Sequence, residues 1–394
     1  MSPASQRTRA EGNASMTIRA LRPDDLPQVQ EVLATRDGVG PEDAARRTEI
    51  LGYIAFCNPY ADPDEGRYFV VEDEGRIVAL HGRMPVMFSI GGKRFKGYYV
   101  HDLSVHRSAL KKAQGLMLTL ALAQAIEEET DSFLCLLGMT PLNQMMQRRR
   151  RYHELFTDSY VKVLRPEHVL PAAIGQKWLA RLLGLCVRPL VAAADWFIHR
   201  RHRRLPEPVP DKDFDERFDR LFERVAAKFP VCTVKDAAYL NWKYGDGPCN
   251  EDTVLVRREG DEILGSIIVG TVISRGVDTG VIKEIMADPE DTETLSILVS
   301  GAVRFLARQK VSAILCLLSD ERIGRILRRF LFFRRAGHEA LFIGNLEKAG
   351  AHRELLSDIR NWHMMFGESD LFMFGRDRPS ILKNWKSPAE KASS

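Results

Sequence analysis

Two adjacent side chains, His101 and Asp102, are of types that accept a proton near neutral pH, so they are the first candidates for catalysis. They lie in the short apolar run 98–105, which is typical of a β-strand. Neighbouring side chains of a strand point to opposite faces, so we expect only one of the two to face a site. Histidine has the ordinary pKa better suited to a base, whereas a carboxylate in a strand is either a site residue or a structural one.

A basic stretch follows this strand. Lys111 and Lys112 lie in a predicted loop, 106–113, and a helix is expected to begin at Gln114 or Gly115. Backbone N–H groups and the positive end of a helix dipole would meet two ammonium groups there, an arrangement that suits a phosphate. The alternative is an ordinary strand-to-helix connection whose lysines are solvated.

The elements that must position these groups follow a definite order. Apolar periodicity and turn residues predict a strand, two helices, a hairpin, the strand 98–105, a buried helix, another strand and a last helix. The expected ranges are 17–20, 23–35, 42–56, 68–72, 77–87, 86–90, 98–105, 114–127, 133–137 and 141–153.

The same order returns in the second half of the chain, with helices first and strands after them. Leu-Cys-Leu-Leu at 134–137 recurs at 315–318, and Asp102 corresponds to Glu284 at almost the same separation. This separation is far too long for a solenoid repeat, so it predicts two copies of one domain. The expected second-half ranges are 213–229, 234–244, 253–256, 263–272, 281–287, 295–309, 313–318 and 322–332.

Two domains therefore account for most of the chain, and the segments around them differ in composition. A polar leader and a polar tail are expected to be flexible, and a basic helical segment that ends in prolines is expected to connect the domains. The predicted divisions are the leader 1–15, a first domain 16–160, a connector 161–210, a second domain 211–375 and a tail 376–394.

The order of elements resembles that of the GNAT N-acyltransferase superfamily. Residues 102–106, Asp-Leu-Ser-Val-His, are similar to the end of the family's fourth strand, and 110–115 lie where the family has its pyrophosphate-binding loop. Asn143 lies where the family often has an asparagine that begins its late helix. The resemblance implies a mixed α+β fold of two tandem GNAT-like domains. Each would contain a mostly antiparallel mixed sheet flanked by helices.

The resemblance also implies a co-substrate, acetyl-CoA or another acyl-CoA, and favours Asp102 over His101 as the site residue because the family has an acidic residue there. The sequence departs from the family at Lys111 and Ala113, which replace loop glycines, and near Arg150, where a tyrosine often protonates the leaving thiolate. The implied acyl-CoA-binding residues are Leu103, Ser104, Val105, Lys111, Lys112, Ala113, Gln114, Gly115 and Asn143.

The second copy departs further from the family. Its loop 287–293 is acidic and lacks glycine, so it would repel a pyrophosphate. We therefore expect acyl-CoA in the first copy, while the second, degenerate copy completes the substrate cleft. Glu284 is expected either to recognise substrate or to hydrogen-bond within its own sheet.

Composition narrows the functional class. The 394 residues carry 57 basic and 53 acidic side chains, and a net charge of +4 gives no reason to expect a nucleic-acid partner. The six cysteines are scattered without a CxxC pair, which indicates thiols in a reducing compartment. No metal-ligand spacing and no signal peptide is visible, so we expect a cytoplasmic, metal-independent protein.

One segment, 178–198, is apolar enough to suggest a membrane. It contains Arg181, Arg188, Pro189 and Asp195, so a bilayer-spanning helix would bury three charges and a kink. Two interpretations remain. The segment either packs on the domains as a connector or, with the basic run that follows it (178–204 in all), contacts the inner face of a membrane peripherally.

The sequence thus predicts an enzyme that moves an acyl group, acetyl in the simplest case, from CoA to a primary amine by direct attack in a ternary complex. The acceptor would be a small molecule or an envelope-glycan precursor. Two alternatives stay open: a Fem-type transferase, which also has two GNAT-like halves but takes aminoacyl-tRNA as donor, and a non-catalytic binding or scaffold protein.

Overall fold

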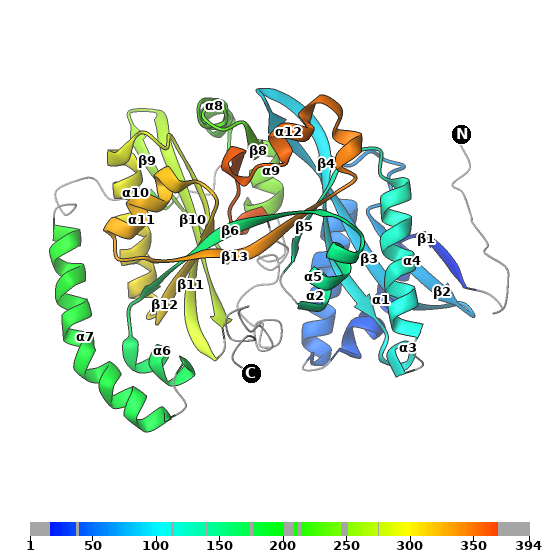
Figure 1. The fold of residues 1–394 in the computed structure, drawn as a ribbon, viewed down its shortest axis with the longest axis horizontal. Coiled ribbons are helices and arrows are strands. Elements are labelled where there is room, and N and C mark those ends of the chain that lie inside the picture. The colour runs from blue at the N-terminus through cyan, green and yellow to red at the C-terminus, as the bar shows by residue number, and fades with distance from the viewer. Residues whose placement is uncertain are drawn as a thin grey trace.

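The structure, a computed structural model, describes residues 16–36, 39–111, 114–138, 141–173, 176–200, 209–210, 214–245, 251–274 and 276–368. The expected leader and tail, together with Lys112, Ala113 and Cys249, lie outside these described residues. Within them, helices lie on the faces of one large mixed sheet (Figure 1).

The first half follows the predicted order closely. Its elements are β1 (Thr17–Ala20), the 3-10 helix η1 (Pro23–Asp25), α1 (Leu26–Ala34), α2 (Pro41–Phe56), β2 (Tyr68–Asp73), β3 (Arg76–Ile90), β4 (Lys93–Val105), α3 (Arg107–Lys111), α4 (Gln114–Glu129), β5 (Leu134–Gly138), α5 (Pro141–Arg149) and β6 (His153–Val163). The segment 106–113, predicted as a loop, is helical in part, because α3 occupies most of it.

The connector consists of α6 (Pro166–Ala173), α7 (Lys177–Arg200) and the short strand β7 (Val209–Pro210). The second half then repeats the order of the first. Its elements are α8 (Glu216–Ala226), β8 (Val231–Thr233), α9 (Ala237–Leu240), the π-helix η2 (Asn241–Gly245), β9 (Thr253–Glu259), β10 (Glu262–Ser274), β11 (Val277–Ala287), α10 (Thr292–Arg308), β12 (Ala313–Leu318), α11 (Glu321–Arg329) and β13 (Phe333–Gly344). The segment after β13 contains η3 (Leu346–His352), α12 (Arg353–Leu356), η4 (Ile359–Asn361), β14 (Trp362–His363) and η5 (Phe366–Glu368).

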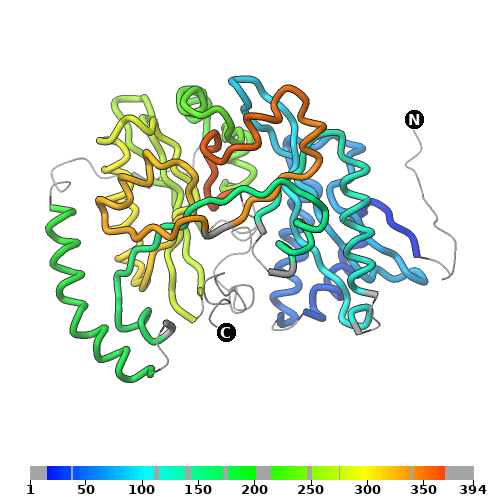
Figure 2. The backbone as a smooth tube through the Cα atoms, viewed as in Figure 1, coloured from blue at the N-terminus to red at the C-terminus, as the bar shows by residue number. Residues whose placement is uncertain are grey.

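The described strands form a single 14-stranded sheet whose main path runs β1-β2-β3-β4-β5-β13-β6-β12-β11-β10-β9-β7. Strands β1 to β5 of the first half lie on one side of the central pair β13 and β6. Strands β12, β11, β10, β9 and β7 lie on the other side. The two central strands are exchanged: β13 pairs with β5 of the first half, and β6 pairs with β12 of the second. Figure 2 shows the two chain segments crossing the middle of the molecule side by side.

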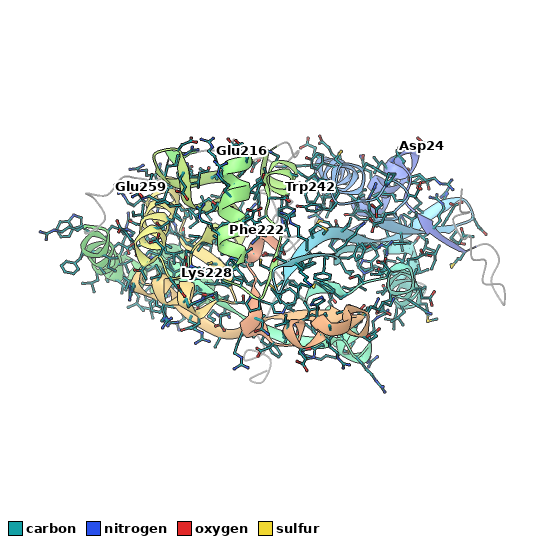
Figure 3. The ribbon with its side chains drawn as sticks, turned by 90° about the horizontal axis from the view of Figure 1, so that it is seen from above. Asp24, Glu216, Phe222, Lys228, Trp242 and Glu259 are labelled. Carbon is teal, nitrogen blue, oxygen red and sulfur yellow. The ribbon has the colours of Figure 1, made fainter. Side chains whose placement is uncertain are left out.

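Neither exchanged strand was predicted, and both affect the expected division of the chain. The boundary predicted after residue 160 falls inside β6, which runs to Val163, and the two halves share one sheet instead of each having its own. Further contacts join the halves. Tyr60 Oη donates to Asp236 Oδ1 at 2.5 Å, and Arg94 forms an ion pair with the other oxygen of that carboxylate. In Figure 3, Trp242 lies between α8 and the helices of the first half.

Apolar side chains cover both faces of the first-half strands. One face packs on α1 and α2 through residues such as Val29, Ile50 and Ile54, and the opposite face packs on α4 through Leu118 and Leu122. The prediction of a buried α4 therefore holds for only part of its surface, because Leu116 and Met117 are exposed. Strand β4 therefore lies between two layers of helices.

The cysteines that the structure describes are unpaired: Cys57, Cys135, Cys186, Cys232 and Cys316. Burial raises the pKa of the Cys232 thiol to about 12, which makes it an unreactive core residue. In the described part of the chain, no group of three or more His, Cys, Asp or Glu side chains is arranged to hold a metal ion.

Candidate active site

The pairing of β4 with β5 ends early. These parallel strands pair only at Tyr98 with Leu134 and at Tyr99 with Cys135. β13 pairs with the other side of β5 along its whole length, from Leu134 to Gly138, while β4 continues to Val105 with β3 as its only other partner among the described strands. We call the side of Val100–Val105 that faces away from β3 the β4 edge. Unpaired backbone groups of this kind can accept an extended ligand, in the way that a strand is added to a sheet.

A bulge lies in the middle of this edge. The register between β3 and β4 shifts between Leu80 and Gly82, so that β4 has one residue more than β3 there. Asp102 lies in the bulge with φ 53°, in the left-handed region that is strained for most residues and tolerated by aspartate. Such strain is concentrated at functional sites in proteins.

The bulge corrects the expectation that His101 and Asp102 face opposite ways. Because the extra residue interrupts the alternation, His101 Nδ1 lies 3.1 Å from Asp102 Oδ2. The Tyr68 hydroxyl donates to the same carboxylate oxygen at 2.8 Å, and the Tyr68 ring packs edge-on against the His101 ring. The three side chains therefore form one group, which we call the β4 triad. Tyr68 was not predicted as a site residue, because from its sequence it is only a strand aromatic.

Gly82 makes room for this group. A Cβ atom at Gly82 would lie 2.6 Å from the Tyr68 ring and 3.1 Å from His101 Nε2, too close for any side chain. The site is also nearly dry: His101 is 5% exposed and the Asp102 side chain 9%. If Asp102 accepts the Nδ1 proton, Nε2 carries the free lone pair, and Nε2 has no hydrogen-bond partner among the described residues.

His81 lies behind the triad and has a structural role. Its Nδ1 lies 2.9 Å from the backbone oxygen of His101, a distance that fits an N–H donor. Burial lowers the pKa of His81 to about 4, so its ring is neutral near pH 7. His81 therefore supports the backbone of the bulge.

Two arginines from the helical layer stand beside the triad. Arg47 of α2 is 7% exposed; burial lowers its pKa, and the charge of Asp102 acts in the opposite direction. Arg36 donates to Ser104 Oγ at 3.1 Å, which places that predicted acyl-CoA residue on the same side of the sheet. This side of the bulge thus has positive charge as well as a carboxylate.

Leu103 and Val105, also predicted for acyl-CoA, pack on the opposite face with the α4 cluster. Their side chains help to fix the strand, so any contact with a ligand would come from their backbone groups. The predicted phosphate site lies at the end of this strand, where Lys111 ends α3 and Gln114 begins α4. A Cβ at Gly115 would meet Leu110 Cδ2 at 2.6 Å, so this glycine accommodates the packing of α3 on α4, and its predicted contact with acyl-CoA stays a prediction.

Asn143 lies in the first turn of α5, directly after β5, and its side-chain oxygen accepts from Gln147. Its position agrees with the predicted late helix, and no contact joins it to the β4 triad among those described. The nearby Arg150 is paired with Glu127, and Tyr152 also donates to that carboxylate. These groups hold α4 and the start of β6 together.

The corresponding edge of β11 in the second half is filled by protein. β11 also has a one-residue bulge, between Ile282 and Glu284, and it also stops pairing with its parallel neighbour, β12, at Ile282. There, however, the backbone N–H of Ile285 donates to Met365 Sδ and its carbonyl lies 3.1 Å from His363 Nε2. The segment Trp362–Glu368 therefore occupies the place that stays open along β4.

Glu284 belongs to a buried ionic cluster at this bulge. Its carboxylate is 2.5 Å from Lys235 Nζ and accepts from the Tyr244 hydroxyl at 2.9 Å. Lys235 also pairs with Glu368 at 2.8 Å. Burial favours the neutral form of Lys235, but the charges of Glu284 and Glu368 outweigh it and raise its pKa. Of the two roles predicted for Glu284, these contacts support the structural one.

Comparison with known proteins bears on the fold. No family model and no curated protein matches the sequence. Solved structures of Saccharomyces cerevisiae N-myristoyltransferase do match, one with bound myristoyl-CoA (TM-score 0.52, 12% identity, 85% of this chain and 79% of that one). Another, with myristoyl-CoA and inhibitors, has a TM-score of 0.51 at 13% identity over 85% and 80% of the two chains. A GCN5-related N-acetyltransferase from Anabaena variabilis follows with a TM-score of 0.49 at 12% identity, over 84% and 72%.

The chain has the fold of an acyl-CoA N-acyltransferase. The match extends over most of both chains, so it includes the shared sheet as well as the first half. At such low identity the likeness concerns the fold alone, and the expected fold class is confirmed. Which residues act, and on what, must be argued from the geometry of this chain.

Proposed function

We propose that this protein is an acyl-CoA-dependent N-acyltransferase composed of two tandem GNAT-like units, about 16–160 and 211–375. The observation that carries the proposal is the contrast between two equivalent strands. Beyond Tyr99 no described strand pairs with the β4 edge, which bears the His101–Asp102 pair at its bulge, whereas the β11 edge is covered by Trp362–Glu368. The donor is therefore assigned to the first unit.

The donor would lie along the β4 edge. The backbone of Val100–Val105, which pairs with no described strand on the side away from β3, suits the amides of a pantetheine arm, and its N–H groups on that side would stabilise the negative oxygen of a tetrahedral intermediate. The start of α4, at Gln114, lies just beyond the end of β4 and carries the positive end of a helix dipole toward a pyrophosphate. Lys111 and Lys112 would add charge there.

The acceptor is a primary amine, which is protonated near pH 7 because its ordinary pKa is about 10.4. The β4 triad would receive the proton through the His101–Asp102 pair, whose Nδ1 and Oδ2 atoms lie 3.1 Å apart. His101 Nε2 is buried beside Gly82, so the ring would have to turn toward the edge for that atom to accept. The amine nitrogen then attacks the thioester carbon, the carbon–sulfur bond breaks, and CoA leaves as a thiolate that takes the second proton lost by the nitrogen as the amide forms. A thiol has an ordinary pKa of about 8.5, so the thiolate can leave without a fixed acid such as the missing tyrosine.

Isothermal titration with acetyl-CoA and longer acyl-CoAs tests donor binding. We expect saturable heat, and we expect Lys111→Gln with Lys112→Gln to weaken binding at least about tenfold, since charge-assisted contacts contribute about 1.5–3 kcal/mol each. Lys93→Gln with Lys310→Gln removes the same charge elsewhere and should leave affinity unchanged. No heat with any acyl-CoA would overturn the proposal in favour of a binding or scaffold protein.

A further inference from the structure

Helix α7 (Lys177–Arg200) is built with its polarity reversed. Apart from Ile198, which packs against the core, the side chains that face the protein are mostly small or polar, and most of the large apolar ones face solvent. Trp178 and Leu190 are 72% and 70% exposed, and Trp196 and Phe197 are 51% and 60% exposed. In a helix packed only for stability, this pattern would be the opposite.

The inward face is fixed by specific contacts. Asp195 pairs with the buried Lys162 at 2.5 Å, and His199 Nδ1 lies 2.7 Å from Ser300 Oγ. Arg188 pairs with Glu167 of α6 at 3.1 Å. A Cβ at Gly184 would collide with the backbone of Glu167, so α7 lies directly against α6. The helix is therefore attached along its length, and its outward face is a fixed feature of the surface.

The outward face carries positive charge at its margins. Lys177, Arg181 and Arg200 supply this charge, whereas Arg188 pairs with Glu167, and the only acidic residue of the helix, Asp195, pairs with Lys162. The helix thus contributes +3 of the chain's +4, and the remaining 370 residues contribute only +1. The sequence continues with three more arginines within four residues. Tryptophan, leucine and arginine on one face are the composition of helices that lie in the interface of an anionic membrane.

We propose that α7 docks this protein on the surface of an anionic lipid bilayer, with the helix parallel to the membrane plane. Its apolar length, 24 residues and a mean hydropathy of 1.4 over its most apolar window, would also permit a span. A span would have to break the contacts of Asp195, His199 and Arg188 and to bury charges in hydrocarbon. A second copy is disfavoured too, since a two-fold contact would bring two sets of four basic residues together. α7 lies at one end of the molecule, away from β4 (Figures 1 and 3).

Flotation of the full chain with vesicles tests the proposal without any acyl-CoA. We expect the protein to float with vesicles of equimolar phosphatidylcholine and phosphatidylglycerol, to do so weakly with phosphatidylcholine alone, and to be released by high salt. Trp178→Ser with Trp196→Ser should lower the partition coefficient at least about tenfold. Phe56→Ser with Phe156→Ser, on exposed aromatic side chains elsewhere, is the matched control and should float like the parent.

Three results would overturn the proposal. The first is failure to float on anionic vesicles, and the second is equal flotation of the tryptophan variant and the parent. The third is resistance to extraction by alkaline carbonate, which would indicate a span. A self-association that the tryptophan variant abolishes, with no vesicle binding by the parent, would assign the face to a second copy instead. None of these results depends on acyl-CoA binding, so they are independent of the test of the proposed function.

Discussion

Strands β4 and β11 hold equivalent places in the two halves, and the difference between them explains how one fold serves two purposes. Both carry a one-residue bulge where they stop pairing with their parallel neighbour. At β11 the exposed backbone is covered by Trp362–Glu368, and the bulge carboxylate is neutralised by Lys235. At β4 no described strand pairs with the edge beyond Tyr99, and the carboxylate contacts a tyrosine and a histidine. The same backbone feature is thus structural in one half and available for chemistry in the other.

The substitution with the largest expected effect removes the lysine that pairs with the two buried carboxylates of the second half. Lys235→Ala would leave Glu284 and Glu368 buried together without it, and the free energy of unfolding should fall by about 3–5 kcal/mol in urea denaturation. Lys228→Ala removes an exposed lysine that pairs with Asp288 and Glu290, and serves as the control with little change. A small effect of Lys235→Ala would mean that the second-half cluster is not a structural plug.

Acid should affect both halves through one buried histidine in each. Burial lowers the pKa of His81 to about 4, and burial together with the charge of Lys235 lowers that of His363 to about 4. Between about pH 6.5 and pH 4 the unfolded chain binds protons that the native protein does not, so stability falls as pH falls, by about 3 kcal/mol per histidine.

Denaturation measured at several pH values checks this. His363→Gln should remove about half of the pH dependence, and His81→Gln the other half. A variant that lowers stability without changing the slope against pH would show that the buried ring is not the source.

Substitutions in the β4 triad of the first half should lower kcat. His101→Gln is expected to lower kcat about 100-fold, equivalent to about 2.7 kcal/mol, because the amine loses its proton acceptor, while the affinity for acyl-CoA stays unchanged. Glu284→Gln, the matched change at the other bulge, should alter stability and leave the kcat of the folded enzyme near that of the parent. Equal loss of kcat in both variants would remove the distinction between the halves.

The smallest effect concerns the tyrosine of the triad. Tyr68→Phe deletes one hydrogen bond to Asp102 and keeps the ring that packs on His101, so kcat should fall roughly tenfold. Tyr239→Phe, at a buried tyrosine of the second half, is a control for loss of a hydroxyl and should change stability only. An unchanged rate in Tyr68→Phe would place the hydroxyl outside the reaction.

Most of the fold follows from local signals in the sequence. Strands such as β2 and β5 and helices such as α2 are marked by apolar runs, glycine turns and prolines, and they were predicted close to their observed ends, whereas the single strand β3 was predicted as two segments. The exchanged strands β6 and β13 were missed, because their apolar and charged residues do not alternate cleanly and their partners lie in the other half of the chain. Long-range pairing of this kind leaves little trace in a local pattern.

The site was predicted in part for a similar reason. His101 and Asp102 were identified from their types. Their contact depends on a bulge, and no residue in 98–105 predicts that bulge. Tyr68 could have been found only by aligning β2 with β4 across β3. The plug at β11 depends on Trp362–Glu368, a segment far along the chain whose sequence resembles an ordinary core segment.

A structure of the protein with a non-hydrolysable thioether analogue of acyl-CoA tests the central claim most directly. The account predicts the pantetheine arm along Val100–Val105, its carbonyl near the β4 bulge, and the β11 edge still covered by Trp362–Glu368. An analogue bound along β11, or a β4 edge that stays empty at saturating analogue, would contradict it.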